Sequence, residues 1–141
     1  MESLSNLAAA LIFAALSTAA HAQTCTPVEV RNLRSAQGTL MVVAYTSEAD
    51  FNKKPATALQ LKATEETMSF SVCLPGGESS LALMMFQDLN DNGKMDSNVL
   101  GIPSEPWGSS GKPNPFGPPN WTGAAVPLPT DGKPIVVILS K

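Results

Sequence analysis

Thr39-Leu-Met-Val-Val-Ala-Tyr45 is the stretch that decides the fold, because it is a nearly continuous apolar run of residues that favour β-strands. Leu81-Ala-Leu-Met-Met-Phe-Gln87 has the same character further along the chain. Apolar side chains at almost every position are typical of strands that lie in the middle of a sheet. We therefore expect a central strand over residues 39–45 and a second strong strand over residues 81–87.

Shorter segments outside these two runs also carry strand patterns. Residues 26–31 place Val28 and Val30 on one face and charged side chains on the other, as in a half-buried strand. Further strands are expected over residues 59–63, 66–74, 124–128 and 134–139. Six or seven strands without a long amphipathic helix predict one all-β domain, an antiparallel β-sandwich of immunoglobulin-like or transthyretin-like type. A small barrel is the alternative.

The N-terminus has the pattern of an export signal. Residues 7–20 are apolar over about the length of a signal-peptide core, and Ala20-His21-Ala22 forms an A-x-A cleavage site. Glu2 departs from this pattern, because the segment before the apolar run carries no lysine or arginine. We expect a signal peptide over residues 1–22 and a mature β-sandwich over residues 23–141, located in the periplasm or outside a bacterial cell. No later apolar run is long enough for a transmembrane segment.

Composition argues against several classes of function. The net charge of −3 over 141 residues disfavours a nucleic-acid partner, which would require a basic face. His21, the only histidine, lies in the expected signal peptide, so the mature chain cannot build histidine-dependent triads or histidine-ligated zinc. An enzyme would have to use carboxylates, lysine, tyrosine or a hard cation. We therefore expect no enzymatic activity.

Cys25 and Cys73 are the only cysteines of the chain. In an exported protein the expected state is one disulfide, with two free buried thiols as the alternative. Strand alternation places Cys25 on the same outward side as Glu29, and Cys73 on the outward side of its own segment. This arrangement favours a surface bridge between neighbouring strands.

Residues 88–120 show no periodicity and consist largely of glycine, proline, asparagine and serine. A loop of this length is usually functional when it is ordered. Its first part fits D-x-N-x-N-G-x-x-D, in which oxygen atoms at alternate positions wrap around Ca²⁺. The expected side-chain ligands are Asp88, Asn90, Asn92 and Asp96, with the Lys94 carbonyl and, if the chain folds back, Glu105. Val99 replaces the usual final glutamate, so we expect a weak Kd of about 10⁻⁴ to 10⁻³ M.

The same loop allows other interpretations. Its Asp and Asn side chains could instead bind the backbone of the loop itself, without metal. Asp88 and Glu105 could form a glycosidase-like pair, although so small a domain rarely builds a deep cleft. Trp107, Phe116 and Trp121 could form an aromatic platform for a protein or glycan, or could cap one end of the core.

Three runs in this region have a specific spacing. They are Asp88-x-Asn90-x-Asn92-Gly93-Lys94-x-Asp96, Leu100-Gly101-Ile102-Pro103-x-Glu105-x-Trp107-Gly108-x-Ser110, and Phe116-Gly117-Pro118-Pro119. With them, the chain resembles a bacterial family of exported proteins known as domain of unknown function 2141. The resemblance covers essentially all of residues 23–141 and implies a periplasmic or secreted β-sandwich with no known activity. Leu89, Thr122 and Gly123 stand where family members usually carry acids, which weakens the calcium interpretation.

The leading interpretation is an exported, non-enzymatic binding or accessory domain. Its working surface would be the loop over residues 88–121, because loops on a rigid sandwich often carry binding residues. The partner would be a protein or a glycan that the sequence does not identify. The alternative is a structural envelope protein with a self-stabilised loop and no metal, and a carboxylate- or cation-dependent hydrolase is the third interpretation.

Overall fold

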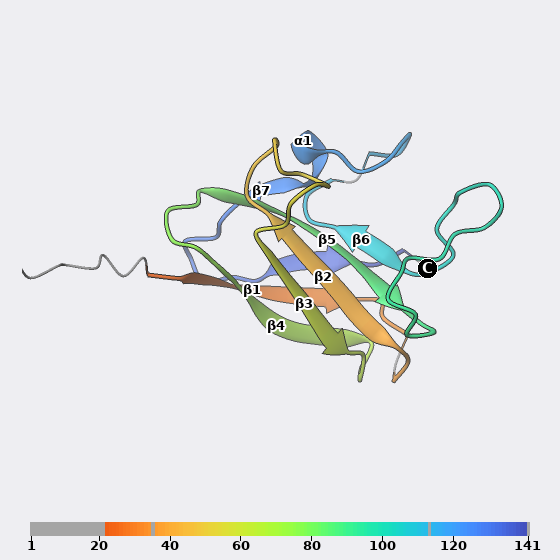
Figure 1. Ribbon diagram of the computed structural model, residues 1–141. Coiled ribbons are helices and arrows are strands. Elements are labelled where there is room, and N and C mark those ends of the chain that lie inside the picture. The colour runs from red at the N-terminus through yellow and green to blue at the C-terminus, as the bar shows by residue number, and fades with distance from the viewer. Residues whose placement is uncertain (1–21, 35, 113, 141) are drawn as a thin grey trace, which may run out of the picture.

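Two stacked β-sheets make up almost all of the computed structural model, which describes residues 22–34, 36–112 and 114–140 (Figure 1). The expected signal peptide lies outside these residues, apart from Ala22. Eight strands and one short helix, α1 (Trp121–Ala124), form within the described part of the chain. The expectation of an all-β sandwich is therefore confirmed. No helix in these residues is long and apolar enough to cross a membrane.

The smaller sheet has the strand order β4-β1-β8. Its strands are β1 (Thr24–Arg31), β4 (Thr67–Leu74) and β8 (Ile135–Ile138). β1 and β4 are antiparallel, and Cys25 lies directly opposite Cys73, with which it forms a disulfide. Thr26 and Val72, which follow and precede these cysteines, are buried, so the bridge lies on the outward side as expected.

One strand pair corrects the expectation of a purely antiparallel sandwich. β8 runs parallel to β1, with Val28 opposite Ile135 and Arg31 opposite Ile138. Parallel neighbours need a long crossover connection. Here the chain passes through every strand of the other sheet before it returns as β8, which provides that crossover.

The larger sheet has the order β3-β2-β5-β6, and β7 also pairs with β5. Its strands are β2 (Thr39–Tyr45), β3 (Thr57–Lys62), β5 (Ser80–Asp88), β6 (Trp107–Ser109) and β7 (Ala125–Pro127). The two apolar runs of the sequence, now β2 and β5, pair with each other at its centre. The central position predicted for residues 39–45 is confirmed.

β6 lies inside the segment that was expected to be one continuous loop, so that expectation was wrong for residues 107–109. Three residues are too few to produce a strand periodicity in the sequence. Gly108 allows the strand to pass close to β8, because a Cβ atom at this position would lie 2.9 Å from the carbonyl oxygen of Ile138. The glycine at position 108 was therefore the only sign of this strand in the sequence.

The core lies between the two sheets, and both contribute alternate residues to it. Its fully buried members include Val28, Val30, Leu40, Val72, Leu74, Leu81, Leu83, Val137 and Leu139. The smaller sheet turns polar side chains such as Glu29 and Ser69 away from this core. The fold thus buries one face of β1 and β4 and leaves the other facing solvent.

The larger sheet differs, because its outer face is apolar as well. Met41 and Val43 of β2, and Met84 and Phe86 of β5, alternate with buried core residues and are half-buried on the side away from the core. At one end of this face a second cluster forms, in which the Phe51 ring contacts the rings of Tyr45 and Trp121 edge-on. The continuous apolar character of residues 39–45 and 81–87 reflects these two covered faces.

Removal of the disulfide should destabilise the protein without changing its fold. The bridge joins residues 48 positions apart, and opening such a loop raises the entropy of the unfolded chain by the equivalent of roughly 4 kcal/mol. We expect Cys25→Ser with Cys73→Ser to lower the free energy of unfolding in urea by about that amount. The register of β1 and β4 should persist, with an unchanged far-ultraviolet circular dichroism spectrum. A loss below about 1 kcal/mol would contradict this account of the bridge.

Candidate functional site

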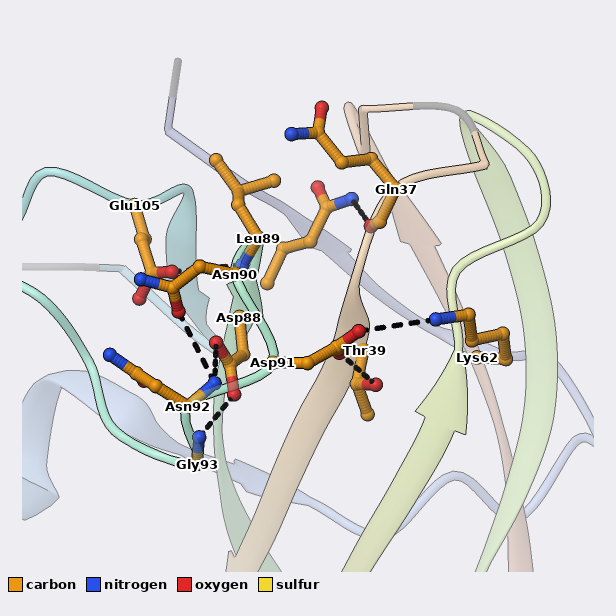
Figure 2. A network of polar contacts seen from close by, with 11 residues as sticks. Gln37, Thr39, Lys62, Asp88, Leu89, Asn90, Asp91, Asn92, Gly93 and Glu105 are labelled. Atoms are coloured by element: carbon orange, nitrogen blue, oxygen red, sulfur yellow. Dashed lines mark hydrogen bonds and ion pairs between the residues drawn. The ribbon is translucent and has the colours of Figure 1, made fainter.

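The loop after β5 begins at a buried carboxylate. Asp88, the last residue of β5, has only 2% of its surface exposed. Its Oδ1 accepts a hydrogen bond from the backbone N–H of Asn92 (3.1 Å), and its Oδ2 accepts one from that of Gly93 (2.6 Å), as Figure 2 shows. The side chain therefore curls the following five residues into a tight turn.

A second buried carboxylate holds the far side of the same loop. Glu105 folds back, as its expected role required, and its side chain is 6% exposed. Its Oε1 accepts a hydrogen bond from the N–H of Leu89 (2.8 Å), and its Oε2 accepts one from the N–H of Asp96 (3.0 Å). Glu105 thus joins the segment before β6 to both ends of the turn over residues 88–96, which we call the Asx-rich turn.

The other side chains expected as calcium ligands lie together within this turn. The carboxylate of Asp96 accepts hydrogen bonds from the side-chain amides of Asn90 (2.7 Å) and Asn92 (3.0 and 3.1 Å). The amide oxygen of Asn90 accepts from the N–H of Asn92, and the amide oxygen of Asn92 accepts from the N–H of Lys94. The residues of the sequence pattern therefore lie together, and the side-chain oxygen atoms of each accept hydrogen bonds from other residues of the loop.

Asp91 was missed by the sequence analysis, although it attaches this turn to the sheet. Its carboxylate accepts hydrogen bonds from the hydroxyl of Thr39 (2.7 Å) and the ammonium group of Lys62 (3.3 Å) (Figure 2). These two contacts lower the pKa of Asp91 below its ordinary value. Its partners are 52 and 29 residues away, so no local pattern could have revealed them.

Within the described residues, no three His, Cys, Asp or Glu side chains form a group that could hold a metal ion. Asp88, Asp96 and Glu105 therefore do not constitute such a group by themselves. A calcium ion at this turn would have to take amide or backbone oxygens as additional ligands.

Beyond the turn, residues 97–103 form a short hairpin that projects from the sandwich, seen in teal in Figure 1. The N–H of Asn98 donates to the carbonyl of Ile102, and that of Gly101 donates to the carbonyl of Asn98 (both 2.9 Å). At the tip, Val99 and Leu100 are almost completely exposed. Backbone hydrogen bonds therefore order this hairpin, although residues 97–103 show no strand pattern in the sequence.

An apolar cleft lies between this hairpin and residues 117–119. It has a volume of about 550 Å³ and is lined by Met84, Met95, Gly101, Ile102, Pro103, Trp107, Gly117, Pro118 and Pro119. Met84 and Trp107 come from β5 and β6, whereas the remaining residues come from loops. Of these residues, only Trp107 was expected from the sequence to be a binding candidate. The apolar run over residues 81–87 was a signal for Met84 alone, because the remaining residues lie in loops without periodicity.

The three aromatic residues of the loop lie in different environments. Trp107 is half-buried in β6 and lines the cleft. Trp121 begins α1 and packs edge-on against Phe51, with ring centroids 6.2 Å apart, so it covers the outer face of the sheet. Phe116 is 94% exposed. One platform made of all three is therefore not observed, and Trp107 is the aromatic residue of the cleft.

Asp88→Asn should cost more stability than Asp91→Asn. The first change replaces one buried acceptor oxygen by an NH₂ group that faces a backbone N–H, which costs about 1–3 kcal/mol. The second weakens only contacts at the exposed surface, which water and salt screen, so it should cost less. Urea unfolding of both variants tests this difference. Equal losses would show that the buried carboxylate does not hold the turn.

A comparison with known families covers the same region. The family model described as "Uncharacterized protein conserved in bacteria (DUF2141)" matches residues 28–135, which run from β1 to the start of β8 and include the whole loop. No curated protein and no solved structure matches the chain. The match extends over most of the sequence, and it confirms the resemblance carried by the loop motifs. The chain therefore belongs to this bacterial family of uncharacterised proteins.

Proposed function

We propose that this protein is an exported, non-enzymatic binding domain, and that its binding site is the apolar cleft between residues 97–103 and 117–119. The cleft itself carries the proposal. Its volume of about 550 Å³ falls within the range of roughly 300–1,000 Å³ that is typical of ligand sites. An exposed apolar hollow of this kind usually marks a place where another molecule binds.

The lining of the cleft favours a protein partner over a glycan. Apart from the indole of Trp107, the lining side chains offer no strong hydrogen-bonding group, and proline and methionine predominate. A sugar would need polar groups beside the aromatic ring, whereas an aliphatic or aromatic side chain of a protein would not. Methionine side chains adapt their shape to such partners. The ligand we propose is therefore an apolar segment of another protein.

Two further features support export and the absence of catalysis. A disulfide persists in oxidising compartments, and the family is bacterial, so the periplasm or the extracellular space is the expected location. The Asp88 and Glu105 carboxylates are buried and accept hydrogen bonds from the backbone. Carboxylates held in this way serve the loop rather than a substrate, which disfavours the hydrolase interpretation.

A displayed library of random peptides tests the cleft directly. We expect selection against the full chain to enrich peptides with aromatic or aliphatic residues. In a Trp121→Phe background Trp107 is the only tryptophan, so its fluorescence should change when a selected peptide binds. Ile102→Asp should weaken this binding at least tenfold, because it places a charge on the wall of the cleft.

The matched control is Ile138→Asp. Ile138 is as exposed as Ile102 (62% against 55%), but it lies on β8 and does not line the cleft. Its replacement should leave peptide affinity unchanged. If no peptide is enriched and Ile102→Asp changes nothing, the structural alternative gains support. If oligosaccharides bind instead and shift the Trp107 fluorescence, the partner is a glycan.

A weak calcium site in the Asx-rich turn is a second candidate function. It is favoured by the gathering of Asp88, Asn90, Asn92 and Asp96 within one turn. If the ion binds with a Kd near 1 mM, 10 mM Ca²⁺ should stabilise the fold by about 1.4 kcal/mol relative to EDTA. Thermal unfolding would then show a higher Tm by several degrees, lost in Asp88→Asn with Asp96→Asn. An unchanged Tm at 10 mM Ca²⁺ would exclude calcium as a ligand of the turn in this range.

A further inference from the structure

Four of the six methionines of the chain line one hollow on the outer face of the larger sheet, and all of them except Met85, which is buried in the core, are partly exposed. This hollow has a volume of about 160 Å³ and lies beside the cleft described above. Met41 comes from β2, Met84 from β5, and Met95 from the Asx-rich turn. Two strands and one loop therefore bring three thioethers to the same place.

The strand register explains how two of them meet. Met41 lies opposite Phe86, and Val43 lies opposite Met84, so Met41 and Met84 are diagonal neighbours on one face. Diagonal neighbours are about 7–8 Å apart, a distance that long side chains can bridge. Met41 and Met84 are only half-buried, and Met95 is 38% exposed, so all three side chains are partly open to solvent.

The chemistry of the hollow selects a narrow class of ligand. Gln60 is the only polar side chain in the lining, and no carboxylate, histidine or thiol belongs to it. A hard cation such as Ca²⁺ or Mg²⁺ would gain little from sulfur donors. Soft thioether ligands instead favour Cu(I) and ions of similar character, and the flexible methionine side chain can turn its sulfur toward such an ion.

We propose that Met41, Met84 and Met95 form a thioether site for one soft monovalent cation, Cu(I) or its redox-stable analogue Ag(I). Met84 and Met95 line both this hollow and the proposed partner cleft, whereas of these two Met41 lines only the hollow, and Ile102 and Trp107 line only the cleft. Met41→Leu should therefore weaken ion binding without weakening peptide binding, and Ile102→Asp should do the reverse.

The test is a titration of the chain with Ag(I), carried out without a polyhistidine tag. The methionine methyl groups are labelled with ¹³C, and nuclear magnetic resonance follows each of them. We expect the resonances of Met41, Met84 and Met95 to shift together and to saturate at one equivalent. The methyl of Met68, which lies on β4 in the smaller sheet and does not line the hollow, should shift little. Calorimetry with Cu(I), kept reduced by ascorbate, should give the same stoichiometry.

Leucine variants assign the ligands, because leucine keeps the volume and the apolar character of methionine but has no sulfur. Met41→Leu and Met95→Leu should each lower the Ag(I) affinity at least tenfold. Met68→Leu is the matched control, since Met68 lies on β4 in the smaller sheet. Met95 is on an exposed loop, so its replacement keeps the test valid if Met41→Leu fails to fold. An equal effect of Met68→Leu, or uniform shifts of all methyl groups, would overturn the proposal.

Discussion

The arrangement of the functional surface depends on two buried carboxylates. β5 ends at Asp88, whose carboxylate accepts hydrogen bonds from two backbone N–H groups and so curls the next five residues into a turn. Glu105 then joins the start of this turn to Asp96 and brings the chain back toward the sheet before β6 begins. A buried carboxylate without hydrogen-bond partners is costly, so these contacts specify where the loop can lie. Met95, the hairpin and one wall of the cleft take their positions from them.

The larger sheet gives the molecule its asymmetry. Both faces of β2 and β5 carry apolar side chains, whereas β1 and β4 of the smaller sheet expose mainly polar side chains. On the outer face of the larger sheet, Phe51, Trp121 and α1 cover one end, and the loop after β5 covers another part. The apolar cleft and the methionine hollow lie side by side on this face, where they share Met84 and Met95.

Much of the fold could be predicted from local pattern. Residues 39–45 and 81–87 were apolar enough to be placed in the sheet from composition, and alternation placed Cys25 and Cys73 on outward positions that form a bridge. The parallel pairing of β8 with β1 could not be predicted, because it depends on the path of the whole chain through the other sheet. β6 was missed because three residues carry no period.

At the site, only the placement of residues can be compared with the sequence. Asp88, Asn90, Asn92 and Asp96 of the D-x-N-x-N-G pattern lie together, because the spacing of such residues is a local property of one turn, and their role as calcium ligands stays a prediction. The contacts of Asp91 with Thr39 and Lys62 depend on residues far away in the sequence. The convergence of Met41, Met84 and Met95 likewise requires the strand register and the path of the loop. Neither could be derived without the tertiary structure.

The central claim is that the protein's own carboxylates order the loop and so build the cleft. Hydrogen exchange of single backbone amides, measured by nuclear magnetic resonance with excess EDTA, tests it most directly. The account predicts that the N–H groups of Leu89, Gly93 and Asp96 are strongly protected without any added ion, because each donates to Asp88 or Glu105. Glu105→Gln should accelerate exchange at Leu89 and Asp96 while the amides of β2 stay protected. Exchange of these loop amides as fast as in an unfolded chain would contradict the account.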